Sequence, residues 1–87
     1  GMHAHKRLRQ LLVPVCGFFD ITVDDGIKKK CFKMDNPATG LFIDCNIWRE
    51  ISNFSDKSVC LVLASEHFDQ EDYIHDYSAF KKLVTQT

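Results

Sequence analysis

His3 and His5, near the start of the chain, are separated by a single residue, Ala4. Residues two apart on a β-strand project from the same face, so both imidazoles would lie side by side if this segment is extended. Such a pair can hold a metal ion, contact a phosphate or transfer protons, because imidazole titrates near neutral pH. The alternative is a pair of exposed histidines on a poorly ordered chain end. The spacing by itself leaves these possibilities open.

The composition describes one small domain. The chain has 87 residues, of which 45% are hydrophobic and seven are Phe, enough for a core. A net charge of −1 gives no electrostatic reason to expect nucleic acid or an anionic membrane as a partner. No apolar run approaches the ~20 residues that span a bilayer, and the N-terminus has no hydrophobic region of the secretory type. We therefore expect a cytoplasmic protein that contacts no membrane.

The four cysteines do not form a recognisable redox or zinc motif. They are Cys16, Cys31, Cys45 and Cys60, spread almost evenly and without a C-x-x-C pair. Each lies in or beside an apolar, strand-like run. The sequence predicts reduced and mostly buried thiols.

Most of the chain has the pattern of short strands. Apolar residues alternate with polar ones around Ile21, and Asp24-Asp25-Gly26 is a typical hairpin turn. The apolar run at 59–64 predicts a strand buried on both faces. Taken together, the pattern predicts strands over residues 4–16, 19–24, 27–34, 41–43, 47–51 and 59–64.

The end of the chain changes from the period of a strand to that of a helix. Tyr73, Tyr77, Phe80 and Val84 recur at helical spacing, and Asp69 could cap the helix. We expect a helix over about 70–84 that packs this stripe against the strands. The sequence thus predicts a single all-β domain over residues 1–87, a jelly-roll barrel or sandwich with a short C-terminal α-helix.

Five short motifs, in order along nearly the whole chain, carry a resemblance to a known family. The sequence is similar to the dTDP-sugar 3,4-ketoisomerases, cupin β-barrels of the WxcM-like C-terminal type. The motifs are G-x-H-A-H-K-x-L-x-Q at 1–10, D-D-G at 24–26, G-L-F-I at 40–43 with I-W-R-E at 47–50, L-V-L-A-S-E at 61–66, and D-Y-I-x-D-Y at 72–77.

The resemblance implies a fold and an activity. Members of the family shift the keto group of a dTDP-4-keto-6-deoxyhexose from C4 to C3, which supplies deoxyamino sugars for lipopolysaccharide and other glycans. They are cupin barrels, need no metal or other cofactor, and are usually homodimers. The substrate, a dTDP-linked keto sugar, would be the partner of this chain.

The sequence departs from the family in two respects. Asp44 and Cys45 stand where the family usually has two prolines. In addition, the family's domain begins upstream of the histidine motif, and its first strands supply a tyrosine and an arginine of the active site and part of the dimer. The chain would lack these strands. The resemblance therefore leaves two functions open: an isomerase, or a catalytically inactive cupin that binds a nucleotide sugar or serves as a subunit module.

A keto shift requires a base, because one proton leaves the carbon beside the ketone and another is added at the former carbonyl carbon through an enediol. Histidine has a suitable pKa for both halves of this reaction. By resemblance we assign His5 as the catalytic base and His3 as its catalytic partner.

Four residues are predicted to bind the substrate. Arg49 could hold the pyrophosphate through its planar guanidinium, and Trp48 could pack on the base or sugar. Lys6 and Gln10 belong to the first motif. On one regular strand Arg9, not Gln10, would share the histidine face, so a β-bulge would be needed to turn Gln10 inward.

Metal binding is the competing use of the histidines. Cupin metal sites take a third histidine from a second motif, where this chain has Trp48. His67 and His75 are predicted to lie on the surface, and two histidines with a glutamine are a poor ligand set for a transition metal. We therefore expect no metal, although a metal-dependent cupin oxygenase would be the alternative.

Overall fold

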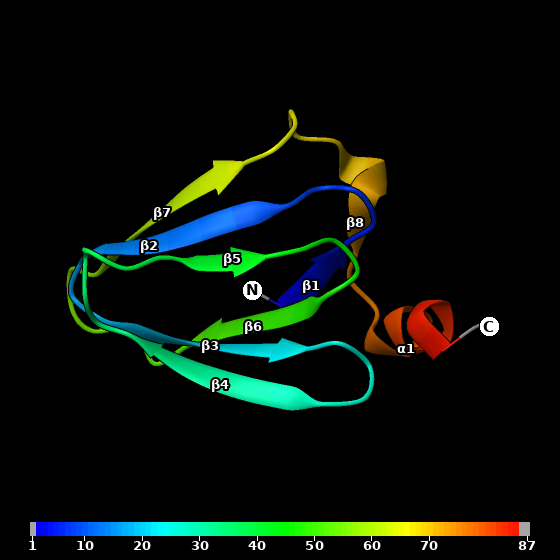
Figure 1. Ribbon diagram of the computed structural model, residues 1–87, viewed down its shortest axis with the longest axis horizontal. Coiled ribbons are helices and arrows are strands. Elements are labelled where there is room, and N and C mark those ends of the chain that lie inside the picture. Colours follow the sequence, from blue (N-terminus) through cyan, green and yellow to red (C-terminus); the bar gives the residue numbers. More distant parts are fainter. Residues whose placement is uncertain (1, 86–87) are drawn as a thin grey trace.

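The computed structural model describes residues 2–85 and consists mainly of β-strands (Figure 1). It contains eight strands, one 3₁₀ turn and one α-helix within these residues. The elements are β1 (Met2–His5), β2 (Gln10–Cys16), β3 (Phe19–Asp24), β4 (Lys29–Met34), β5 (Leu41–Ile43), β6 (Trp48–Ser52), β7 (Val59–Ala64), η1 (Gln70–Asp72), β8 (Tyr73–Ile74) and α1 (Tyr77–Thr85).

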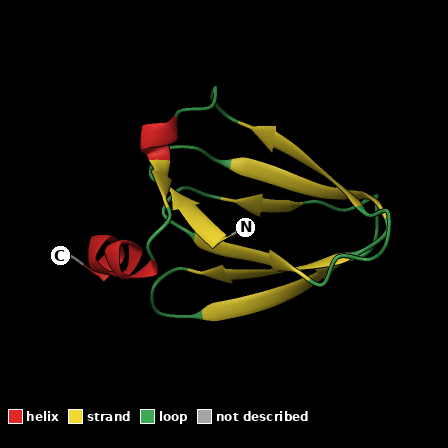
Figure 2. Ribbon diagram, turned by 180° about the vertical axis from the view of Figure 1, so that it is seen from behind, coloured by secondary structure: helices red, strands yellow, loops and turns green. Residues whose placement is uncertain are grey.

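The strands form two antiparallel sheets that face each other, and α1 lies beside them at one end (Figures 1 and 2). The larger sheet has the order β4-β3-β6-β1-β8 and the smaller one the order β5-β2-β7. One apolar core fills the space between the sheets, and a second lies between the larger sheet and α1. The buried members are Leu12, Phe19, Ile21, Met34 and Ile43 in the first core, and Ala4, Trp48, Ile74 and Phe80 in the second. The prediction of an all-β fold with a short C-terminal helix is confirmed.

The strand predicted over 4–16 is two strands in different sheets. β1 ends at His5, and the chain crosses to the other sheet before β2 begins at Gln10. The carboxylate of Asp72 causes this break, because it accepts hydrogen bonds from the backbone N–H groups of Arg7 (2.7 Å) and Leu8 (3.2 Å). These donors are therefore unavailable to a sheet ladder.

The helix predicted over about 70–84 begins later, at Tyr77. Its expected first half is the η1 turn followed by β8, because Tyr73 and Ile74 pair with β1 instead of continuing a helix. Asp69 caps η1 by accepting from the N–H of Glu71. Within the part that is helical, Phe80 packs in the second core as expected. No helix within residues 2–85 is long and apolar enough to span a bilayer.

β7 is an exposed edge strand, and the prediction that it is buried on both faces is wrong. Val59, Leu61, Val62 and Leu63 are 44–52% exposed. Among the described residues β7 pairs only with β2, so its far edge is uncovered, and of its side chains only Cys60 is half-buried and packs against the first core. Val62 lies opposite buried Leu12 on β2, which shows that the space between the sheets is open on this side.

The predicted burial of the cysteines is also wrong. All four are free thiols, but Cys16 and Cys31 are exposed while Cys45 and Cys60 are half-buried. Cys31 shows the reason: its neighbour Phe32 lies opposite Ile21 and packs against the core, so strand alternation turns Cys31 to the outer face of β4.

Candidate active site

His3 and His5 lie on the inner face of the larger sheet, as the spacing predicts. β1 has β6 on one side and β8 on the other, with His3 opposite Arg49 and His5 opposite Tyr73. Paired residues in a sheet share a face, so these four side chains form one group. The ring centroids of the two histidines are 4.8 Å apart, and the Tyr73 ring lies 4.3 Å from that of His5.

A buried carboxylate fixes the orientation of His5. The Nδ1 atom of His5 lies 3.1 Å from Oδ2 of Asp72, and both residues are almost completely buried. Burial acts to raise the pKa of Asp72, but the hydrogen bonds from the Arg7 and Leu8 N–H groups and from His5 outweigh it and lower that pKa. Asp72 is therefore ionised near neutral pH and accepts the proton on Nδ1 of His5.

This hydrogen bond leaves the other ring nitrogen of His5 free. When Nδ1 carries the proton, Nε2 has a lone pair and is the basic atom of the ring. Nε2 of His5 is buried and has no hydrogen-bond partner among the described residues. A buried and unpaired polar atom is costly, and such atoms are often found where a ligand completes the bonding.

Both histidines are held in the neutral form near pH 7. Burial, followed by the positive charge of Arg49, lowers the pKa of His3 to about 4. The same two causes lower the pKa of His5, although the hydrogen bond and charge of Asp72 oppose them. Neutral imidazole can accept a proton, so this state suits a base.

Arg49 is the largest fully buried side chain, and it lies beside the histidines. Its Nη1 donates to Oε1 of Gln10 (2.6 Å) and its Nη2 to the carbonyl of Ile47 (2.9 Å). Burial lowers its pKa to about 10, so the guanidinium remains charged at neutral pH. Its Nε–H is buried and unpaired among the described residues, which gives the site a second group that a ligand could satisfy.

Gln10 joins the site, but no bulge near it is required. β2 begins at Gln10 in the opposite sheet, so the alternation of faces restarts there and its side chain reaches Arg49. Arg9 is exposed and pairs with Asp44 at 3.3 Å. The break between β1 and β2 thus turns Gln10 toward Arg49 without the predicted bulge.

Trp48 cannot stack on a ligand at the histidines, and its predicted role is wrong. It precedes Arg49 on β6 and therefore faces the opposite side of the sheet. There it is 4% exposed and packs against the rings of Tyr77 and Phe80 from α1. Lys6 is exposed at the end of β1, so its predicted role in substrate binding stays a prediction.

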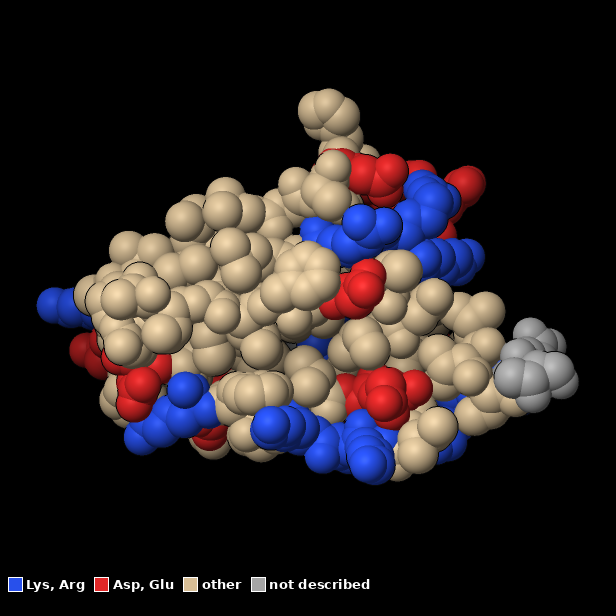
Figure 3. Space-filling model, viewed as in Figure 1, with Lys and Arg blue, Asp and Glu red and all other residues tan. Residues whose placement is uncertain are grey.

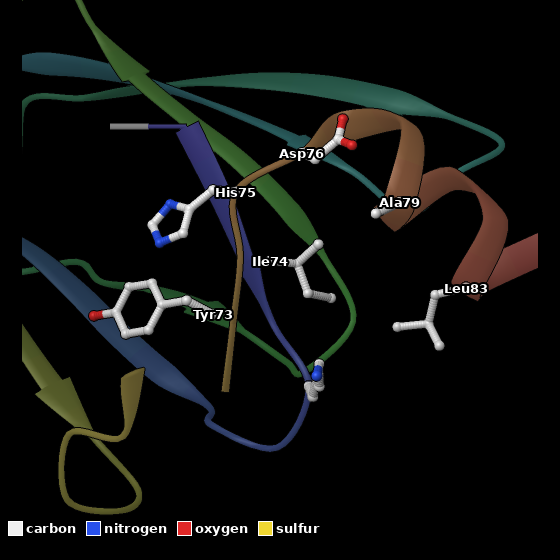
Figure 4. Close-up of a pocket in the computed structure, with 7 residues that line it drawn as sticks. Tyr73, Ile74, His75, Asp76, Ala79 and Leu83 are labelled. Carbon is white, nitrogen blue, oxygen red and sulfur yellow. The ribbon is translucent and has the colours of Figure 1, made fainter. Parts of the chain in front are cut away.

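Two aromatic residues that were not predicted as site residues from the sequence, Tyr73 and His75, complete the site. Tyr73 and His75 have nearly parallel rings with centroids 5.3 Å apart, and Figure 4 shows both pointing to one side of the chain while Ile74 points to the other. The His75 centroid is 6.3 Å from that of His3. A groove of about 370 Å³ lies beside β8 and α1, and it is lined by Lys6, Tyr73, Ile74, His75, Asp76, Ala79 and Leu83. The D-Y-I motif contained a signal for Tyr73 and Asp72, although not for their roles.

The histidines do not form a metal centre with other residues that are described. Within residues 2–85, no three histidine, cysteine, aspartate or glutamate side chains are placed to hold one metal ion. His67 is exposed in the segment between β7 and η1, as predicted for the surface. His75 is also exposed, but it belongs to the aromatic group beside His3.

Comparison with known proteins identifies relatives of the whole chain. The family model described as FdtA, WxcM-like, C-terminal matches residues 1–85. The chain is 41% identical over 86 residues to the TDP-4-oxo-6-deoxy-alpha-D-glucose-3,4-oxoisomerase of Aneurinibacillus thermoaerophilus, covering 99% of this chain and 62% of the relative. The chain therefore spans about three-fifths of the length of this curated relative.

Solved structures of similar proteins confirm the cupin-type fold. A 3,4-ketoisomerase from Helicobacter canadensis matches with a TM-score of 0.93 and 42% identity, over 97% of this chain and 63% of that one. A substituted form of the 3,4-ketoisomerase QdtA from Thermoanaerobacterium thermosaccharolyticum, in complex with TDP-4-keto-6-deoxyglucose, matches with a TM-score of 0.94 and 33% identity, over 97% and 61% of the two chains. By its family match, its sequence identity and its fold, this chain belongs to the WxcM-like C-terminal family that includes sugar 3,4-ketoisomerases.

Proposed function

We propose that the protein is an isomerase that shifts the keto group of a TDP-4-keto-6-deoxyhexose between C4 and C3. The relatives support the reaction and the substrate class, because they are named as 3,4-keto- or oxoisomerases and one is complexed with TDP-4-keto-6-deoxyglucose. The observation that carries the proposal is the buried, unpaired Nε2 of His5, whose other nitrogen is held by Asp72. A proton acceptor in this setting is what the reaction needs.

The proposed reaction consists of four proton transfers, two from the substrate to the histidines and two from the histidines to the substrate. Nε2 of His5 removes the proton from C3, the electron pair forms the C3–C4 double bond, and the C4 oxygen receives a proton from neutral His3. The resulting enediol then loses the proton on the C3 oxygen to His3, while His5 returns its proton to C4. Both histidines end as they began, and no oxidant, reductant or metal is consumed.

Arg49 would assist this chemistry through its charge. Its guanidinium lies beside His3 on the same face and is fully buried, so its field is poorly screened by solvent. A fixed positive charge there would stabilise negative charge that develops on the two sugar oxygens. Binding of the pyrophosphate by Arg49 or Lys6 stays a prediction, and Lys6 is the more accessible of the two.

The direct test combines the wild-type chain with TDP-4-keto-6-deoxyglucose in deuterated buffer and follows the C3 and C4 signals by NMR. The proposal requires exchange at C3 and formation of the 3-keto isomer.

A second function, a nucleotide-sugar-binding or subunit module, is favoured by the open side of the sandwich at β7 and by coverage of only 62% of the curated relative. Binding of TDP without exchange would support this second function.

The proposal places the reaction in the cytoplasm, where the product would feed deoxysugars into lipopolysaccharide or other glycans. The support is the nucleotide-linked substrate of the relatives.

Because the proposed steps need no Lewis acid, the purified protein is expected to be active without a bound transition metal. Elemental analysis should find well below one equivalent of iron, manganese or zinc per chain, and treatment with a chelator should leave the exchange rate unchanged. A full equivalent of metal that is lost in a His3→Gln variant, together with loss of activity, would contradict the metal-free reaction.

We also propose that the protein is a homodimer, because β7 presents an uncovered edge and several exposed apolar side chains. Exposed strand edges and large apolar patches favour association. Figure 3 shows a broad surface without charged residues over the β2, β5 and β7 side of the molecule. Light scattering at micromolar concentration should give the mass of a dimer, and a Leu61→Lys variant should shift it toward the monomer. A monodisperse wild-type monomer would contradict the proposal.

A further inference from the structure

Three histidine rings form a row from the interior of the protein to its surface. His5 is fully buried, His3 is half-buried and His75 is exposed. The centroids are 4.8 Å apart between His5 and His3 and 6.3 Å apart between His3 and His75. The ring of Tyr73 packs against all three, at 4.3, 5.1 and 5.3 Å from His5, His3 and His75 respectively.

Two charged groups near the buried end of the row, Asp72 and Arg49, are poorly placed to exchange protons with solvent. Asp72 is buried, and its oxygens accept three hydrogen bonds. Arg49 is fully buried and keeps its proton at neutral pH. His75 is exposed. It occupies the x position of the D-Y-I-x-D-Y motif, where the motif specifies no residue type.

We propose that His75 exchanges protons between solvent and the buried histidine pair, acting through His3. Water or a buffer acid protonates His75; the proton then moves to His3 and on to Nε2 of His5, and the reverse sequence removes it. The first step breaks a bond to hydrogen in the solvent or buffer acid and forms an N–H bond on His75, and each later step breaks one N–H bond and forms another, so no proton is consumed. A centroid separation of 6.3 Å leaves room for a direct contact of ring edges or about one bridging water. His3 would carry the proton only transiently, because its pKa is about 4.

The value of this path for catalysis rests on the proposed isomerase function, whereas the path itself does not. In the isomerase, it would let a proton taken from C3 exchange with solvent before it reaches C4. His75 would therefore be a relay residue that touches neither reacting carbon.

The test measures how fast His5 interconverts between its neutral and protonated forms, by NMR relaxation dispersion at ring Cε1 of the labelled chain without substrate. Each variant is studied at the titration midpoint of its own His5, so that a shift of that pKa does not affect the comparison. His75→Phe keeps a ring to stack on Tyr73 but removes the ionisable nitrogens. We expect it to slow the interconversion by about tenfold or more, since an exposed imidazole is an efficient proton shuttle.

Two further variants make the result specific. His67→Phe removes another exposed histidine, outside the row, and should leave the rate unchanged. His75→Ala should be slow by itself and should recover when free imidazole is added to the buffer, which a structural role of His75 would not produce. A rate in His75→Phe within about twofold of the wild type, or no recovery with imidazole, would overturn the proposal. Failure of the wild type to isomerise its substrate would count against the isomerase alone.

Discussion

His5→Asn is expected to lower the rate of C3 proton exchange in TDP-4-keto-6-deoxyglucose by about 10²–10⁴-fold, the usual contribution of a positioned general base. The structural reason is that Nε2 of His5 is buried and unpaired, on the same face as His3 and Arg49. Asparagine fills part of the same space but cannot accept a proton at neutral pH. Exchange is followed by NMR in deuterated buffer, and TDP affinity is measured in parallel.

The matched control is His67→Asn, which makes the same change at an exposed histidine away from the sheet. It should exchange at the wild-type rate. TDP should bind His5→Asn nearly as well as it binds the wild type, because the base acts on the sugar and not on the nucleotide. If His5→Asn exchanges as fast as the wild type, His5 is not the base, and His3 becomes the candidate; family membership would be unaffected.

Asp72→Asn is expected to reduce the same exchange rate by about 10²-fold or more, because the carboxylate selects the tautomer of His5. An amide that donates to Nδ1 would place the proton on Nε2 and remove the basic lone pair. The folded state should also lose about 1–3 kcal/mol, since the single amide oxygen cannot accept all of the bonds from Arg7, Leu8 and His5 that the Asp72 carboxylate accepts. Urea denaturation measures this second effect.

The control for this variant is Glu71→Gln, which neutralises the adjacent, exposed carboxylate. It should change neither the rate nor the stability appreciably. The ring ¹⁵N shifts of His5 distinguish positioning from a general loss of structure, because they report which nitrogen carries the proton. A folded Asp72→Asn protein that keeps both the Nδ1–H tautomer and the wild-type rate would show that Asp72 does not position the base.

Strand faces and hairpin turns depend on residues that are close in the sequence, and local sequence patterns predicted them. The i, i+2 spacing of His3 and His5 placed both on one strand face, and Asp24-Asp25-Gly26 predicted the β3–β4 hairpin. The same alternation could have shown that Trp48 and Arg49, as consecutive residues of a strand, cannot both face the histidines. The structure places them on opposite sides of β6.

Contacts between distant parts of the chain were not accessible from local patterns. Asp72 lies 67 residues from His5, and its acidic side chain suits the first turn of a helix as well as it suits the anchor of an imidazole. Tyr73 fitted the helical spacing of Tyr77 and Phe80 by coincidence, whereas pairing with β1 makes it part of a strand. The exposure of β7 likewise depends on which strands lie beside it, and its apolar sequence does not specify them.

The most direct test of the central claim is the NMR spectrum of TDP-4-keto-6-deoxyglucose incubated with the wild-type chain in deuterated buffer. If the chain is the isomerase, the C3 proton signal is lost and the 3-keto isomer appears, without added metal. Binding of TDP with no exchange at C3 at any pH between about 6 and 9, where neutral imidazole is available as a base, would contradict this claim.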